Sequence, residues 1–379
     1  MVTTDRRTIL VLGAGVIGGQ VADLLARMND RYRIALAARD PDRVRHRANL
    51  AITVAMNLGF VPIVDPYATD VFDLARTAEL IHEVQPDLIV NATSVQTFWR
   101  ISLLPPPLYQ TLDRARIGPW LPNHLATALA VMRAVRVSGT AAPVVNASFP
   151  DAVNPALATV GLAPLIGAGN IANLVPTLRR AAGAMLGVAP DGFQLRFAAH
   201  HYACNAISSH GHAEGAPTVL GVRLSDDAPA VPLDPAALFA SVAGRYRRVR
   251  GIDGQIVAAS STAAMADAVL ADQPRALHAP GVAGLPGGYP VIVGRGAATP
   301  DFDTTVDRET AVAVNIEGQR LEGIDAIEPD GTIRFGAAQM EVLTATIGYR
   351  CQQMHVNDAK HWADELQARY GAIAQQAAA

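Results

Sequence analysis

The chain has 379 residues, of which 50% are hydrophobic and 17% are charged, so it is long enough for about two or three domains. This composition excludes a disordered chain and a single small module. The formal net charge of −3 at pH 7 provides no basic surface for nucleic acids or anionic membranes, so we expect small molecules and further copies of the same chain as partners.

The rare residue types narrow the class of protein further. Lys360 is the only lysine, which excludes a lysine Schiff base in the centre of the chain. Cys204 and Cys351 lie far apart and form no C-x-x-C motif, a pattern typical of a reducing compartment. No stretch approaches about 18 consecutive apolar residues, the length that crosses a membrane. We therefore expect a soluble, cytoplasmic protein.

The first part of the chain alternates between strand-like and helix-like patterns. Short apolar runs predict strands, and apolar residues at helical spacing predict the helices between them. The expected strands are residues 8–12, 32–37, 61–64, 87–90 and 143–147, and the expected helices are residues 16–28, 42–58, 72–84 and 123–136. This order predicts an α/β fold with a Rossmann-type doubly wound parallel sheet, and a dinucleotide-binding domain over residues 1–150.

A proline-rich segment between residues 95 and 122 interrupts this alternation. It contains Phe98 and Trp120, and aromatic residues argue against disorder. Long loops in compact domains are often functional, so we expect a lid that closes over a substrate. Arg100 in this segment is either a clamp for an anion or a solvated surface residue.

The remaining chain predicts a second, α+β domain over residues 151–379 for substrate binding and dimerisation. The expected elements are helices at 173–187, 260–270, 336–350 and 356–370, a strand at 193–199, and short strands within 290–334. The alanine-rich helix at 260–270 is a candidate interface in a homodimer. We expect the Ala/Gln tail after Ile373 to be frayed.

A glycine-rich motif follows the first expected strand. The sequence Gly-Ala-Gly-Val-Ile-Gly begins at Gly13 and fits G-x-G-x-x-G between a strand and a helix. Gly13 permits the tight turn, Gly15 lets the backbone approach a pyrophosphate, and Gly18 allows close packing of the helix. Val16 and Ile17 open the helix, whose N–H groups bind phosphate. We expect a nicotinamide dinucleotide here, and the alternative is a glycine turn without a ligand.

The end of the second strand bears on the choice of dinucleotide. NAD-binding proteins usually place Asp or Glu there to bind the ribose 2′-hydroxyl, but Ala38 stands at this place and Arg39 follows it. A small residue with a guanidinium leaves room for a 2′-phosphate and binds it. The sequence therefore favours NADP, with NAD as the alternative if Arg39 is a surface residue and Asp40 turns inward.

Small polar residues follow the fourth and fifth strands, at the sheet edge where such folds bind ligands. Asn91, Ala92 and Thr93 suit close packing against the cofactor, and Asn146 is a candidate to face the nicotinamide. Either asparagine could instead cap the turn that follows it.

Histidines cluster directly after the expected strand at 193–199. Histidine titrates near neutral pH, so it can donate or accept the proton that accompanies hydride transfer. We prefer His201 for this role, then His200, then His210, with packing or surface histidines as the alternative. The ligand spacing matches no zinc pattern, so we expect no metal.

The second half resembles the lactate/malate dehydrogenase superfamily, of which the chain would be a divergent member. The resemblance lies in the order and spacing of loose motifs across most of residues 8–350, namely those at 146–151, 154–155, 161–162, 165–170, 186–188, 200–201, 260–263 and 281–291. The resemblance implies that His200 or His201, where the expected strand at 193–199 ends, is the catalytic histidine. It also implies assembly into homo-oligomers.

Two positions depart from that family. Its members carry an Asp that orients the histidine and, three residues later, an Arg that binds the substrate carboxylate. Here Asn170 or Asn173 stands near the Asp position, and the next arginine is Arg179. We therefore expect Asn173 or Asn170 to hold the substrate or the histidine through neutral hydrogen bonds. An ordinary 2-hydroxy acid is disfavoured as substrate.

The first half has a second likeness. Residues 36–41 and 86–92 look like saccharopine dehydrogenase-type reductases, many of which use NADP.

Together these residues predict an NADP-dependent oxidoreductase, a dehydrogenase or reductase, that moves hydride between nicotinamide and a carbonyl or imine carbon. One alternative is a non-catalytic NADP-binding regulator or scaffold. Another is an enzyme that uses transient redox for elimination or hydrolysis.

Overall fold

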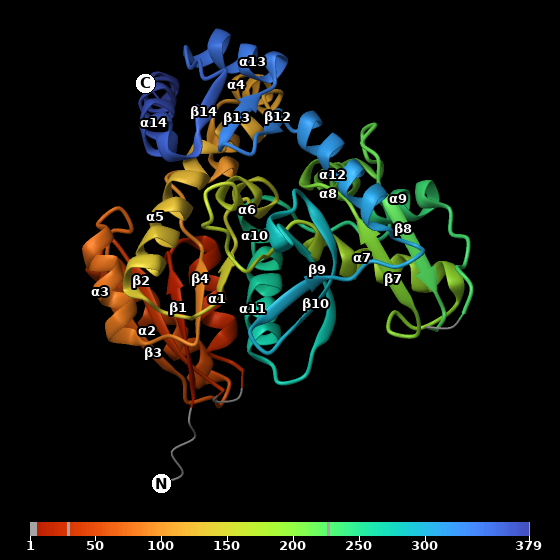
Figure 1. The fold of residues 1–379 in the computed structure, drawn as a ribbon, viewed down its shortest axis with the longest axis horizontal. Coiled ribbons are helices and arrows are strands. Elements are labelled where there is room, and N and C mark those ends of the chain that lie inside the picture. The colour runs from red at the N-terminus through yellow and green to blue at the C-terminus, as the bar shows by residue number, and fades with distance from the viewer. Residues whose placement is uncertain (1–5, 29–30, 226–227, 379) are drawn as a thin grey trace.

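A six-stranded parallel sheet forms the first half of the protein. The structure is a computed structural model that describes residues 6–28, 31–225 and 228–378 (Figure 1). The strand order is β3-β2-β1-β4-β5-β6, and every pairing is parallel. The strands are β1 (Arg7–Leu12), β2 (Tyr32–Ala38), β3 (Ile63–Ala68), β4 (Leu88–Asn91), β5 (Val144–Asn146) and β6 (Ile166–Gly167). This confirms the expected Rossmann-type fold class.

Helices cover both faces of this sheet because its strands are apolar on both sides. Along β1, Leu10 and Leu12 lie in one hydrophobic cluster, while Ile9 and Val11 lie in another on the opposite face. The covering helices are α1 (Val16–Leu25), α2 (Pro41–Asn57), α3 (Leu74–Val84), α5 (Pro122–Ser138) and α6 (Pro150–Ala158). The carboxyl edge of the sheet is where these alternating units leave room for a ligand.

The proline-rich segment is folded and packed rather than open. It forms η1 (Phe98–Leu103), α4 (Pro106–Asp113) and η2 (Gly118–Trp120). Trp120 is 1% exposed, and its ring centroid lies 6.0 Å from that of Phe98 and 5.8 Å from that of Tyr370. These aromatic rings fill a hydrophobic core, which differs from the expected lid over a substrate.

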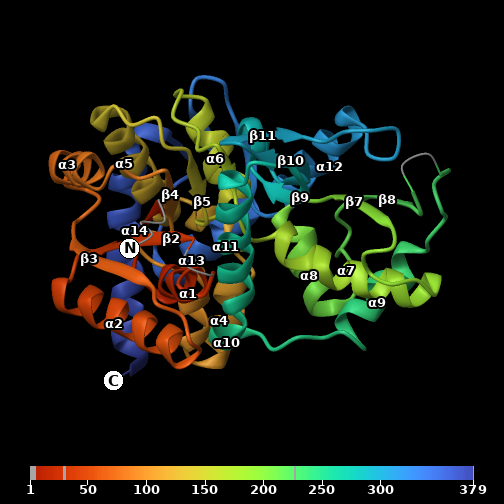
Figure 2. The same ribbon diagram turned by 90° about the horizontal axis from the view of Figure 1, so that it is seen from below.

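The second half is an α+β region beside the sheet. Its elements are α7 (Ile171–Leu186), β7 (Gln194–Ala198), α8 (His201–His210), β8 (Val219–Arg223), α9 (Pro235–Ala243), α10 (Gly251–Gly254), α11 (Ile256–Leu270), β9 (Arg275–Pro280), η3 (Val282–Gly284), β10 (Gly288–Gly294), β11 (Ala297–Pro300) and α12 (Arg308–Leu321). The β7-β8 pair and the β11-β10-β9 sheet are antiparallel. Helix α11 packs against α1 of the parallel sheet (Figure 2).

A small C-terminal unit closes the chain. It contains β12 (Ile324–Ile327), β13 (Thr332–Phe335), α13 (Ala337–Ile347), β14 (Gln353–His355), η4 (Val356–Asp358) and α14 (Ala359–Ala378). Helix α14 packs against α5 and continues to Ala378, so the expectation of a frayed tail after Ile373 is wrong. The packing of Tyr370 and Ile373 into the core explains why the helix persists.

The boundary expected at residue 150 falls inside the sheet region. Strand β6 lies beyond it and pairs with β5, and α11 and α14 return to cover the helices of the first half. The division into two domains stays a prediction, as does the homodimer. Helix α11, the candidate interface, buries residues 265–270 within its own chain. Within the described ranges, no helix is both long and apolar enough to span a bilayer.

Candidate functional site

The glycine turn has the geometry that a dinucleotide requires. Gly13 has φ +106°, and a Cβ there would lie 2.6 Å from the carbonyl oxygen of Ala92. A Cβ on Gly18 would lie 1.8 Å from the carbonyl oxygen of Gly13, so the turn and the helix touch. No atom lies within 4 Å of a Cβ built on Gly15, which is the N-cap of α1 and has no capping side chain. The open space and the free helix N–H groups fit a pyrophosphate, with Val16 and Ile17 in the first turn.

Of the two residues that follow β2, Asp40 binds the backbone of the next helix, whereas the Arg39 side chain is exposed. An Asp40 carboxylate oxygen accepts a hydrogen bond of 3.0 Å from the backbone N–H of Arg43 and so caps α2. Arg39 is exposed and forms no hydrogen bond or ion pair with any described residue. Ala38 is the last residue of β2.

A chain of amide hydrogen bonds ties the carboxyl ends of β4 and β5 together. Asn91 Nδ2 donates to Asn146 Oδ1 at 3.0 Å, and Asn146 Nδ2 donates to Asn154 Oδ1 at 2.8 Å. Asn91 Oδ1 accepts from the backbone N–H and the hydroxyl of Thr93. Asn146 is fully buried, and its amide is committed to protein partners, whereas Thr93 and Ala92 are partly exposed. Contact of these residues with a nicotinamide stays a prediction.

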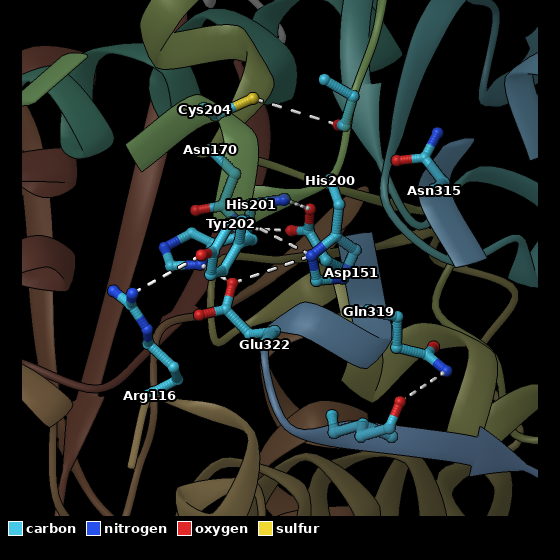
Figure 3. Close-up of polar contacts among 12 residues, drawn as sticks. Arg116, Asp151, Asn170, His200, His201, Tyr202, Cys204, Asn315, Gln319 and Glu322 are labelled. Carbon is cyan, nitrogen blue, oxygen red and sulfur yellow. Dashed lines mark hydrogen bonds and ion pairs between the residues drawn. The ribbon is translucent and has the colours of Figure 1, made fainter. Parts of the chain in front are cut away.

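His201 opens helix α8 and forms an ion pair with Glu322 (Figure 3). The distance from His201 Nδ1 to Glu322 Oε2 is 2.7 Å, and the side chains are 23% and 5% exposed, respectively. Nε2 of His201 forms no hydrogen bond with any described residue. The imidazole is therefore fixed at one nitrogen and open at the other.

Close packing of α12 brings Glu322 to this place. A Cβ on Gly318 would lie 2.3 Å from Cβ of His200, so only glycine lets α12 approach this closely. Glu322 caps the C-terminus of α12, and its carbonyl oxygen accepts a 3.0 Å hydrogen bond from the N–H of Gly118. Helix packing and this backbone bond together orient the carboxylate.

A second buried carboxylate supports the start of α8. Asp151 is fully buried, and its Oδ1 accepts a 3.0 Å hydrogen bond from the backbone N–H of His201. Its Oδ2 accepts from Nδ2 of Asn170. Asn170 has φ +50° and ψ −106°, an unusual backbone conformation for a residue other than glycine. Strained residues of this kind cluster at functional sites, and Phe149, with φ +46°, packs its ring edge-on against His201.

These charges determine the protonation of the pair. Burial alone disfavours the imidazolium, but the charge of Glu322, its hydrogen bond and the charge of Asp151 outweigh it and raise the pKa of His201 to about 9. Burial alone raises the pKa of Glu322, but the His201 charge and hydrogen bond prevail and hold it below its usual value. His201 is thus an imidazolium at neutral pH. This corrects the expectation that neutral hydrogen bonds from Asn170 or Asn173 hold the histidine.

His200 also lies near Glu322, with Nδ1 3.7 Å from Glu322 Oε2, but it differs from His201 in burial and protonation. Its side chain is fully buried, its Nδ1 accepts a 3.3 Å hydrogen bond from the N–H of Tyr202, and burial lowers its pKa. Its Nε2 is buried without a hydrogen-bond partner in the described structure. His200 therefore caps α8 as a neutral imidazole.

Arg116 joins the site from the segment between α4 and η2. Its Nη2 lies 3.1 Å from Glu214 Oε2, and its guanidinium lies 5.0 Å from the ring centroid of Tyr202 (Figure 3). The same glutamate pairs with Nδ1 of His210 at 2.5 Å. The sequence singled out Arg100 instead, but that side chain is exposed.

Asn173 faces away from the histidines. Its side-chain amide contacts the hydroxyl of Ser261 on α11 at 2.7 Å, and it makes no hydrogen bond to His200 or His201. Asn170 is the asparagine that acts near His201, through Asp151. Within the described ranges, no group of three or more His, Cys, Asp or Glu side chains is placed to hold a metal ion.

Comparison with known proteins identifies the fold. No protein-family model matches the sequence, and neither does a curated protein. Among solved structures, minor L-lactate dehydrogenase from Enterococcus mundtii in a ligand-bound form is 14% identical, with TM-score 0.52, covering 84% of this chain and 98% of that one. Lactate dehydrogenase from Eimeria maxima with NADH and oxamate is 13% identical, with TM-score 0.56, covering 85% and 93%.

Malate dehydrogenase from Cryptosporidium parvum is similar in the same way. It is 16% identical, with TM-score 0.53, and the alignment covers 84% of this chain and 98% of that one. The chain therefore spans nearly the whole length of these enzymes, in agreement with the resemblance noted in the sequence. It has the fold of the lactate and malate dehydrogenases.

Proposed function

We propose that the protein is an oxidoreductase that transfers hydride between a nicotinamide dinucleotide and a carbonyl or imine carbon of a small organic substrate. The pairing of His201 with Glu322 carries this proposal, because it creates an imidazolium with a free Nε2 on a partly exposed ring. The glycine turn supports the class of cofactor, as does the fold, which the Eimeria maxima enzyme solved with NADH shares.

His201 would supply the proton in this reaction. Bound dinucleotide provides or accepts the hydride at carbon. During reduction, negative charge develops on the substrate oxygen or nitrogen, and Nε2–H of the imidazolium donates its proton to that atom. During oxidation, the neutral imidazole takes the proton back. Glu322 keeps the other ring nitrogen protonated, and Asp151 holds the backbone at His201, so the exchanging atom is always Nε2.

We infer a preference for NADP over NAD from the two residues after β2. The carboxylate that could bind a ribose 2′-hydroxyl, Asp40, is used as the cap of α2. The exposed guanidinium of Arg39 has no protein partner in the described chain and is free to bind a 2′-phosphate.

Cofactor binding and turnover test the proposal separately. NADPH and NADH are titrated by nucleotide fluorescence, and NADPH consumption is then followed with panels of 2-oxo acids, ketones and imines. We expect NADPH to bind about tenfold tighter or better, and one substrate class to consume it. His201→Gln should retain NADPH affinity and lose on the order of 10²–10⁴ in kcat.

His82→Gln, an exposed histidine on α3, is the matched control and should keep full turnover. Full turnover by His201→Gln would remove the histidine from the reaction, and failure to bind either dinucleotide would overturn the proposal as a whole. A regulator would bind NADPH without consuming it with any substrate. Transient redox would transform a substrate without net loss of NADPH.

A further inference from the structure

Four arginines lie within six residues after α9, and two of them bond to the helices α7 and α8 of the candidate site. They are Arg245, Arg247, Arg248 and Arg250, in the connection that leads from α9 to α10 (Figure 2). Arg248 Nη1 donates a 2.7 Å hydrogen bond to the carbonyl oxygen of Asn173. Arg250 Nη2 donates a 3.1 Å hydrogen bond to Oδ1 of Asn205.

The two asparagines that bind these arginines lie on the helices of the candidate site. Asn205 shares α8 with His201, and Asn173 lies on α7, which Asn170 precedes. Asn205 stands four positions after His201 on α8, and residues at this spacing lie on the same face of a helix, one turn apart. Asn173 lies in the first turn of α7, three residues after Asn170, which binds the Asp151 carboxylate that accepts a hydrogen bond from the backbone of His201. The two guanidinium groups are therefore attached to α7 and α8, the helices that carry Asn170 and His201 at their N-terminal ends.

Neither guanidinium has its charge neutralised by the protein. In the part of the chain that the structure describes, no carboxylate forms an ion pair with Arg248 or Arg250. Burial raises the pKa of half-buried Asp113 on α4, and the charge of Arg250 acts to lower it, but the two side chains form no ion pair. Arg116 provides the contrast, because Glu214 takes up its charge.

The unpaired charge of Arg248 is costly, whereas Arg250 beside it is exposed. Arg248 is half-buried, and burial together with the charge of Arg250 lowers its pKa, which means that its charged form is destabilised there. Each guanidinium carries five N–H donors and can bind an oxyanion through two parallel hydrogen bonds.

We propose that Arg248 and Arg250 bind an oxyanion group of the substrate, a carboxylate or a phosphate, and hold the substrate against His201. This proposal rests on the proposed function and adds to it the class of substrate. A carbonyl or imine compound with an anionic group would be fixed at one end by the arginines, with its reactive carbon one helical turn away near the imidazolium.

Binding of model anions tests this proposal without knowledge of the substrate. Malonate, inorganic phosphate and uncharged malonamide are titrated into the full-length protein by calorimetry, with and without NADPH. We expect malonate or phosphate to bind at least about tenfold tighter than malonamide, and the tighter of the two identifies the chemistry of the anionic group. Arg248→Gln, Arg250→Gln and the double variant should each lose about tenfold or more of this affinity.

The control variants separate this site from other cationic positions. Arg247→Gln removes an exposed arginine of the same connection and should leave anion binding unchanged. Arg39→Gln tests whether phosphate binds at the cofactor site instead. Equal binding of malonamide and the two anions, or unchanged anion affinity in the double variant, would overturn the proposal.

Titration of NADPH distinguishes failure of this proposal from failure of the proposed function. NADPH affinity should be unchanged in all the arginine variants except Arg39→Gln, and unchanged melting temperatures would show that the variants fold. Failure of the wild-type protein to bind NADPH would overturn the proposed function. The anion titration without NADPH would still test the roles of Arg248 and Arg250.

Discussion

His201 Nδ1 lies 2.7 Å from a carboxylate oxygen of Glu322, a residue 121 positions later in the chain. The carboxylate sits at the C-terminal end of α12, where the helix dipole disfavours negative charge. The imidazolium on its partly exposed ring and the buried carboxylate therefore stabilise each other's charge. This relationship makes the protonation of His201 a property of the tertiary fold.

Replacement of Glu322 should shift the pH profile of catalysis. In the wild type, the reductive reaction needs the imidazolium, so its rate should fall as the pH rises through about 9. Glu322→Gln removes the charge that raises the pKa, so the fall should begin at least about one pH unit lower. Glu317→Gln, on the exposed side of the same helix, should keep the wild-type profile. Coincident profiles for Glu322→Gln and the wild type would show that Glu322 does not set this pKa.

Two glycines of the same turn should respond differently to a methyl group. Gly15→Ala places its Cβ in open space, so we expect a wild-type melting temperature and an NADPH affinity reduced about tenfold or more. Gly18→Ala forces a Cβ against the carbonyl oxygen of Gly13, so we expect a loss of about 1–3 kcal/mol in the free energy of unfolding. Denaturant titration and nucleotide fluorescence measure the two effects. Unchanged NADPH affinity in Gly15→Ala would place the dinucleotide elsewhere.

Arg39 should control the choice between the two cofactors. Its guanidinium would make charge-assisted hydrogen bonds to a 2′-phosphate, worth about 1.5–3 kcal/mol. Arg39→Ala should therefore bind NADPH about ten- to a hundredfold more weakly and NADH as before, as measured by fluorescence titration. Arg45→Ala, an exposed arginine of α2, should change neither affinity. An equal loss for both nucleotides would argue against a 2′-phosphate contact.

Buried neutral histidines should make the fold sensitive to acid. Burial lowers the pKa of His278 to about 3 and that of His124 to about 4. Below pH 6.5 the unfolded chain takes up protons that these native histidines refuse, so stability should fall by about 1.4 kcal/mol per pH unit for each of them. His201 acts in the opposite sense, because its raised pKa stabilises the fold below pH 6.5 and that contribution is lost as the pH rises through about 9.

The slope of stability against pH measures this effect. Urea unfolding between pH 6.5 and 5 should give a slope for His278→Gln that is smaller than the wild-type slope by about one proton. His82→Gln, with its exposed side chain, should keep the wild-type slope. Identical slopes for all three proteins would mean that His278 is protonated in the native state.

Much of the fold was predictable because its signals are local. The apolar run of β1, the glycines after it and the helix that follows occupy neighbouring positions, so the sequence predicts both the βαβ unit and the edge of the sheet where a ligand would lie. The expected strand at 193–199 placed His201 close to a strand end, and in the structure it lies three residues after β7, whereas its role in a reaction stays a prediction.

The partners of His201 were not predictable in the same way. Glu322 depends on the approach of α12, which one glycine at Gly318 permits, and nothing near Glu322 in the sequence indicates a histidine so distant along the chain. Arg116 adopts φ +56°, which the sequence does not signal for an arginine. Asn173 was placed by a motif position, but its side chain is taken by α11.

Glu322 lies two positions before β12, where the C-terminal unit begins, and its carbonyl oxygen accepts a hydrogen bond from Gly118 next to the core around Trp120. The Glu322 carboxylate, which raises the pKa of His201, therefore lies at the junction between α12 and the C-terminal unit. A displacement of that unit that moved Glu322 would change the pKa of His201. The position of the C-terminal unit therefore bears on the protonation of His201, although none of the described residues from β12 onward contacts the imidazole by a hydrogen bond.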